Sequence, residues 1–143
     1  KLRNLDLSKK PQLETLSCYE NLLTEIDLSD KPRLKTLLCG FNHIKRLDRS
    51  NKPELRSVFC HENELVKLDL SNKPNLEELC CFRNKITELD LSQTPNLKEL
   101  SCSMNQLTAL DLSKTNKLQD LDVSGNPLTE LDLTETSISK QMH

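Results

Sequence analysis

The sequence predicts a curved solenoid in which one short repeat is stacked along a single axis. One observation is an asparagine that recurs every 21 residues without insertion, at Asn21, Asn42, Asn63, Asn84, Asn105 and Asn126. A second is an aspartate column with the same step, at Asp6, Asp27, Asp48, Asp69, Asp90, Asp111 and Asp132. Repeats of this length bury their apolar face only by stacking. We expect a single domain over residues 1–143, with about six to seven repeats, within a longer protein.

The first arm of each repeat is predicted to be a strand. In residues 34–39, Leu37 and Cys39 fall on one face, whereas Thr36 and Leu38 fall on the other. Alternation with a period of two is the signature of a strand. Stacked arms predict a parallel sheet of about six short strands on the concave face. The asparagine that closes each arm can bond backbone groups of its own turn and of the neighbouring turn.

The second arm, Leu-Thr-x-Leu-Asp-Leu-Ser, predicts extended or 3₁₀ structure on the convex face, with leucines inward and aspartates outward. Proline marks the return turn, where its fixed φ suits a repeated corner. Lysine precedes the first four prolines, at Lys10, Lys31, Lys52 and Lys73. We interpret the convex face as solvated, with this lysine column offsetting the charge of the aspartates. The alternative, cation binding by the aspartates, lacks the clustered oxygen donors of a calcium site.

Two repeats depart from the pattern. Arg49 stands where the other repeats carry leucine. Because burying an unpaired charge is costly, we expect the third repeat to bulge or to turn Arg49 outward. In the last repeat Asn116 replaces proline, Val123 replaces cysteine and Ser139 replaces leucine. We expect the polar residues 134–143 to cap this end partly.

Five of the six cysteines form a column, Cys18, Cys39, Cys60, Cys81 and Cys102. The next member of the column is Val123, which marks it as an apolar core position. Stacked strands lie about 4.8 Å apart, whereas disulfides need Cβ atoms about 3.5–4.5 Å apart. We expect free thiols that act as small buried hydrophobes, with disulfides as the alternative.

Composition excludes some function classes. The formal net charge of −2 provides no whole-chain attraction to nucleic acid or to an anionic membrane. No apolar run approaches the roughly 18 residues that a membrane span needs, so we predict no membrane insertion.

Residues 76–86 read L-x-x-L-x-C-x-x-N-x-I, and L-T-x-L-D-L-S follows the asparagine in the same 21-residue unit. This pattern resembles the leucine-rich repeat family, and the cysteine column resembles its bacterial internalin-like type. The resemblance implies a curved horseshoe with a concave parallel sheet, no catalysis and no cofactor. It also implies adhesion or host-protein binding by a protein that is secreted or lies at the bacterial cell surface. A cytosolic protein or an injected effector is the alternative.

The concave face collects all four aromatic residues of the chain, Tyr19, Phe41, Phe59 and Phe82. Leu38, Phe59 and Cys80 fall in one cross-strand row, with neighbours about 4.8 Å apart, and form an apolar strip. Exposed apolar patches mark interaction sites, and aromatic residues are frequent interface anchors. The alternative for Phe41 and Phe82 is that they fold over the sheet rim and cover backbone.

We therefore predict that the concave face binds another protein, such as a host receptor, with an apolar knob and a basic flank. Tyr19, Leu38, Phe59 and Phe82 are the predicted anchors. The flanking and rim residues are Phe41, His61, Cys80, Glu78, Glu99 and Asp122. The apolar strip could instead pair with a second copy of the chain. The chain could also be a structural spacer, an alternative that gains if Leu38 and Phe59 are covered.

Enzymatic activity is the least favoured hypothesis for this chain. His61 and Cys80 are expected on adjacent strands, with Cα atoms about 7–8 Å apart, within reach of a thiol–imidazole contact. A nucleophile also needs an oriented base, an oxyanion donor and a pocket that excludes water. A metal site would need further ligands. We predict no enzyme and no metal site.

Overall fold

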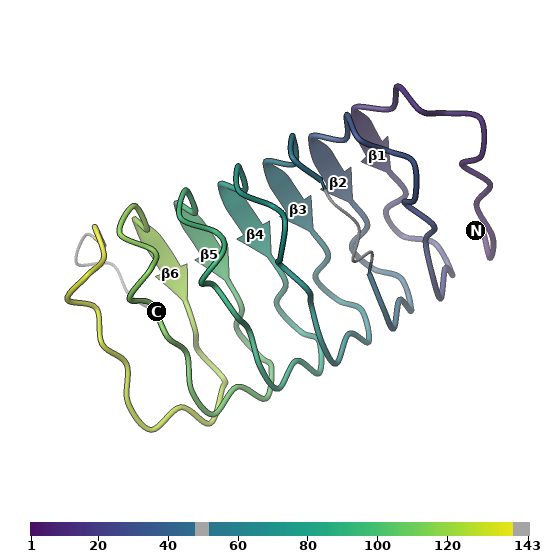
Figure 1. Ribbon diagram of the computed structural model, residues 1–143. Coiled ribbons are helices and arrows are strands. Elements are labelled where there is room, and N and C mark those ends of the chain that lie inside the picture. The colour runs from purple at the N-terminus through teal and green to yellow at the C-terminus, as the bar shows by residue number, and fades with distance from the viewer. Residues whose placement is uncertain (48–51, 139–143) are drawn as a thin grey trace.

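The computed structural model describes residues 1–47 and 52–138, and in it successive turns of chain stack along one axis (Figure 1). The strands are β1 (Thr15–Ser17), β2 (Thr36–Leu38), β3 (Ser57–Phe59), β4 (Glu78–Cys80), β5 (Glu99–Ser101) and β6 (Asp120–Asp122). Within the described residues they form one parallel sheet in the order of the sequence. The predicted fold class is confirmed.

Strand register reproduces the 21-residue step. Leu16 pairs with Leu37, and Leu37 pairs with Val58, so equivalent residues of successive repeats lie side by side. The middle residue of every strand is buried and its two neighbours face outward, as alternation requires. Each column in the sequence is therefore a row of touching side chains in the fold.

The cysteine column lies inside the core. Cys39, Cys60, Cys81 and Cys102 are fully buried, and all six cysteines of the chain are free thiols. Burial raises the pKa of Cys18 to about 11 and that of Cys102 to about 12. The thiols are consequently protonated at neutral pH and pack as small apolar groups, as the sequence predicted.

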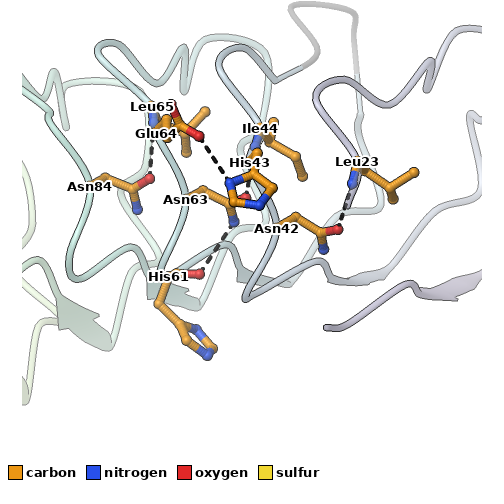
Figure 2. Close-up of polar contacts among 9 residues, drawn as sticks. All are labelled: Leu23, Asn42, His43, Ile44, His61, Asn63, Glu64, Leu65 and Asn84. Carbon is orange, nitrogen blue, oxygen red and sulfur yellow. Dashed lines mark hydrogen bonds and ion pairs between the residues drawn. The ribbon is translucent and has the colours of Figure 1, made fainter. Parts of the chain in front are cut away.

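The asparagine column joins consecutive turns (Figure 2). The Oδ1 of Asn63 accepts a hydrogen bond from the Ile44 N–H at 2.9 Å. Its Nδ2 donates to the carbonyls of Cys39 and Cys60, both at 3.0 Å. Asn42 and Asn84 make the equivalent bonds one turn earlier and one turn later. This confirms that the asparagine satisfies backbone groups of two turns.

The aspartates of the convex face close turns. Their Oδ1 atoms accept the backbone N–H two residues ahead at 2.9 Å, as in Asp90 with Ser92 and Asp111 with Ser113. The hydrogen bonds from Ser92 and Ser113 hold the pKa values of these two carboxyls below the usual value. The rest of this side is extended chain and turns, without a 3₁₀ helix in the ranges that the structure describes.

The expectation of a solvated lysine column is wrong for three of its four members. Lys31, Lys52 and Lys73 are 4%, 2% and 5% exposed, whereas Lys10 is exposed. The Nζ of Lys31 donates to the Ser29 carbonyl at 3.1 Å, and that of Lys73 to the Ser71 carbonyl at 3.2 Å. The long apolar stem can extend the core while the ammonium reaches polar groups of the turn.

Threonine occupies the same position in the next repeats. Thr94 and Thr115 are fully buried, and their hydroxyls donate to the carbonyls of Leu91 at 3.2 Å and Leu112 at 2.9 Å. From Lys31 to Thr115, the position thus holds a buried side chain, and lysine and threonine there supply a donor to the turn in different ways.

The expected effect of Arg49 on the third repeat and the substitution at Ser139 fall outside the described residues. At the last turn, Val123 and Ile138 are half-buried against the core, so packing loosens toward residue 138. Among the described residues there is no helix that is long and apolar enough to cross a membrane.

We expect Asn63→Ala to lower the free energy of unfolding by about 1–3 kcal/mol, because it leaves a buried N–H and buried carbonyls without partners. Chemical denaturation followed by circular dichroism measures this. Asn126→Ala is the control, since Asn126 makes similar bonds but is half-buried and water can replace them. Equal losses in the two variants would contradict the assigned role.

Lys73→Thr should fold, with a loss of less than about 2 kcal/mol, because threonine already fills this position in the following repeats. Lys73→Ala should be less stable by about a further 1 kcal/mol, since it lacks the hydroxyl donor. Urea unfolding of both variants makes the comparison. Equal stability of the two would show that the turn carbonyl needs no donor from this position.

Candidate functional site

Four rings meet on the concave face beyond the ends of β1 to β4. Tyr19, Phe41, His61 and Phe82 form this aromatic cluster. The ring centroids of Tyr19 and Phe41 lie 5.4 Å apart, and those of Phe41 and His61 lie 5.5 Å apart, both edge to face. His61 stacks on Phe82 at 4.6 Å with an interplanar angle of 16°. Both arrangements are favourable for aromatic pairs, so the cluster holds its own shape.

A glycine lets two of these rings meet. Tyr19 and His61 are two repeats apart, with Gly40 at the equivalent position between them. A Cβ atom on Gly40 would lie 2.7 Å from the His61 Nε2 and 2.8 Å from the Tyr19 Cε2. Without that atom, the Tyr19 hydroxyl and the His61 Nε2 form a hydrogen bond of 3.2 Å. Gly40 was not predicted to have a role, although a glycine between Tyr19 and His61 in one column was a visible signal.

His61 and Cys80 lie in direct contact. The Cys80 Sγ is 3.5 Å from the His61 Nδ1, so both ring nitrogens have a partner. His61 is 7% exposed, and burial lowers the pKa of its imidazole, while burial raises the pKa of the Cys80 thiol. Both shifts favour the neutral forms and oppose the thiolate–imidazolium pair that a cysteine nucleophile uses. In the described ranges, no group of three or more His, Cys, Asp or Glu could hold a metal ion.

The apolar strip runs across three adjacent strands. Leu38 pairs with Phe59, and Phe59 pairs with Cys80. All three side chains are half-buried, and the strip leads from β2 toward the middle of the sheet. Leu38 and Phe59 thus retain part of their surface, as an interaction site requires.

Phe41 and Phe82 pack into the aromatic cluster through His61. Phe41 is 43% exposed and has a left-handed φ of 55°. The residue before each repeated asparagine has this conformation, and only the last is glycine: Glu20, Phe41, Glu62, Arg83, Met104 and Gly125. A left-handed φ is unfavourable for residues other than glycine, yet it recurs here with several different side chains. The geometry of the turn, and not the identity of the residue, therefore imposes this conformation.

Acidic side chains cover the other half of the concave face. Glu78 pairs with Glu99, and Glu99 pairs with Asp120, in register across β4, β5 and β6. With Asp122, they make up what we call the acidic half. A depression of about 280 Å³ lies there, lined by Phe59, Cys80 and Ser101, by the four acidic residues, and by the middle leucines of β4 to β6. The rim cation Arg83 pairs with Glu62 instead, at 3.2 Å.

Comparison with known proteins matches residues 74–114 and 95–135 to a family model described as leucine-rich repeats in two copies. The functional domain of InlJ from Listeria monocytogenes, which includes a cysteine ladder, is similar, with 42% sequence identity and a TM-score of 0.93. The match covers 96% of this chain and 31% of that chain. No protein among the curated sequences matches.

YopM from Yersinia enterocolitica is 31% identical with a TM-score of 0.77, over 85% of this chain and 26% of that chain. The internalin InlF from Listeria monocytogenes is 22% identical with a TM-score of 0.75, over 89% of this chain and 40% of that chain, and shares the fold. The chain thus spans less than half the length of each of these structures.

Gly40→Ala should separate Tyr19 from His61, because the new methyl group occupies the space between their rings. We expect an unfolding free energy lower by about 1–3 kcal/mol and a changed tyrosine emission. Tyr19 is the sole tyrosine and the chain has no tryptophan, so this emission reports on the aromatic cluster alone. Ser103→Ala, a buried position of the same column, is the control and should leave the emission unchanged. Unaltered emission in Gly40→Ala would contradict the contact.

Proposed function

Because the chain belongs to the leucine-rich repeat family, we propose that it is an interaction module whose concave face binds a partner protein. The observation that supports this most is the aromatic cluster beside the apolar strip on an unpartnered sheet face. Solenoids use such extended concave surfaces for binding. A few residues supply most of the binding energy in many interfaces, and tyrosine is frequent among them.

The anchor side chains are already ordered in the free chain. Tyr19 is 42% exposed, yet it is held by the His61 hydrogen bond and by the edge of Phe41. A side chain that is already fixed loses less conformational freedom on binding, so more of its contact energy appears as affinity. Leu38, Phe59 and Phe82 continue the apolar surface, with Glu78, Glu99 and Asp122 as its polar rim.

The proposed role is adhesion or host interaction by a bacterial protein that is secreted or displayed at the cell surface. The 42% identity to InlJ supports this placement. The 31% identity to YopM, and the likeness to YopM from Yersinia pestis, which is described as a leucine-rich effector protein, support an injected effector as the alternative. No catalytic role is proposed, since His61 and Cys80 are neutral and partnered with each other.

The test is capture of a partner from host and native-cell extracts, with wild type compared with a Phe59→Asp, Phe82→Asp double variant. We expect at least tenfold less partner with the variant, because two carboxylates replace apolar anchors. The control is a Leu2→Asp, Val66→Asp double variant, which places the same charges at exposed hydrophobic positions outside the concave face. It should capture as wild type does.

Circular dichroism first establishes that both double variants fold. If Phe59→Asp, Phe82→Asp unfolds, Tyr19→Ala with Phe41→Ala removes the two most exposed rings and replaces it. Equal capture by wild type and by the folded variants would overturn the proposal and favour a structural spacer. A mass that rises with concentration in wild type alone would identify a second copy of the chain as the occupant.

A further inference from the structure

We propose that the concave face docks an extended basic segment of the partner, with a Lys or Arg side chain seated in the depression of the acidic half. This inference rests on the proposed function and adds the chemistry of the partner. Three observations support the inference: the shape of the depression, the charge around it, and its continuity with the apolar strip.

The depression suits a long side chain that ends in a cation. Its 280 Å³ are lined by Phe59 and Cys80 and by the acidic residues Glu78, Glu99 and Asp120. Lys and Arg cover apolar surface with their methylene stems while the charged group stays at a polar boundary. The Phe59 ring also offers a face for a guanidinium group. A purely apolar side chain would leave the carboxylates desolvated and unpaired.

The free chain leaves this charge uncompensated. Glu78, Glu99 and Asp120 stand opposite one another on adjacent strands, about 4.8 Å apart, where like charges repel. In the part of the chain that the structure describes, no ion pair reaches any of them. The nearby Lys98 pairs with Glu77 at 3.8 Å. A cation from a partner would relieve this repulsion, whereas nucleic acid or an anionic lipid surface would increase it.

The acidic half continues directly into the rest of the concave face. Cys80 and Phe59 belong both to the apolar strip and to the lining of the depression. From β1 to β6 the sheet spans about 24 Å, the length of an extended segment of about seven residues. Such a segment, lying along the solenoid axis, would place apolar residues on the aromatic cluster and basic residues on the acidic half.

The probe is the heptapeptide acetyl-Phe-Ser-Phe-Ser-Arg-Ser-Arg-amide, and its matched control carries citrulline in place of both arginines. Citrulline keeps the shape and removes the charge. Titration into ¹⁵N-labelled wild type at low salt, followed by amide chemical shifts, gives both affinity and location. We expect shifts in β4 to β6 and at least tenfold weaker binding of the citrulline peptide.

Two variants with the same change in net charge separate the acidic half from general attraction. Glu99→Gln with Asp120→Asn should weaken binding of the arginine peptide at least tenfold. The thermal stability of this variant should not fall, because the substitutions remove repulsion between carboxylates. Asp90→Asn with Asp111→Asn, on the convex face, should bind as wild type does. Asparagine keeps the acceptor that closes those turns.

Equal affinity of the two double variants, equal affinity of the two peptides, or an absence of shifts in β4 to β6 would overturn this inference. So would binding of wild type to phosphatidylglycerol vesicles or to a single-stranded oligonucleotide through the acidic half. This inference can fail while the proposed function holds. A partner that is lost from Phe59→Asp, Phe82→Asp but retained by Glu99→Gln, Asp120→Asn would leave the concave face as the binding site and remove its basic-segment specificity.

Discussion

The amide of one asparagine in every turn bonds backbone groups of its own turn and of the turn before it, and the whole stack depends on this bond. Asn63 connects the Ile44 N–H to the carbonyls of Cys39 and Cys60, and the same set recurs 21 residues earlier and later. With a constant step of 21 residues, the amide of each turn meets the same partners in the turn before it.

Fixed turn length makes much of the fold predictable. Residues 21 apart lie side by side, so alternation within one arm was enough to identify the strands, the buried cysteine column and the outward rows. The same arithmetic placed Leu38, Phe59 and Cys80 in one row and His61 next to Cys80. Nothing beyond strand spacing was needed for these residues, because neighbours on a sheet are set by the backbone.

The conformations of individual side chains could not be predicted from the sequence. The lysine column is predicted to face solvent, whereas Lys52 and Lys73 are buried and extend the core with their stems. Thr94 and Thr115, which stand in the same column, were the visible signal of a buried position. The bond between Tyr19 and His61 depends on the space above Gly40, which no spacing rule describes. The depression in the acidic half likewise depends on how several side chains pack together, as does the orientation of Phe82 against His61.

Contacts in a solenoid usually join only adjacent turns, so unfolding is free to stop between any two of them. The bond between Tyr19 and His61 is an exception, because it joins residues 42 apart and passes over the turn that contains Gly40. Loss of the first turn therefore also removes a partner from the third. The aromatic cluster couples the first turns to one another, and this coupling opposes fraying of the proposed binding surface at the near end of the stack.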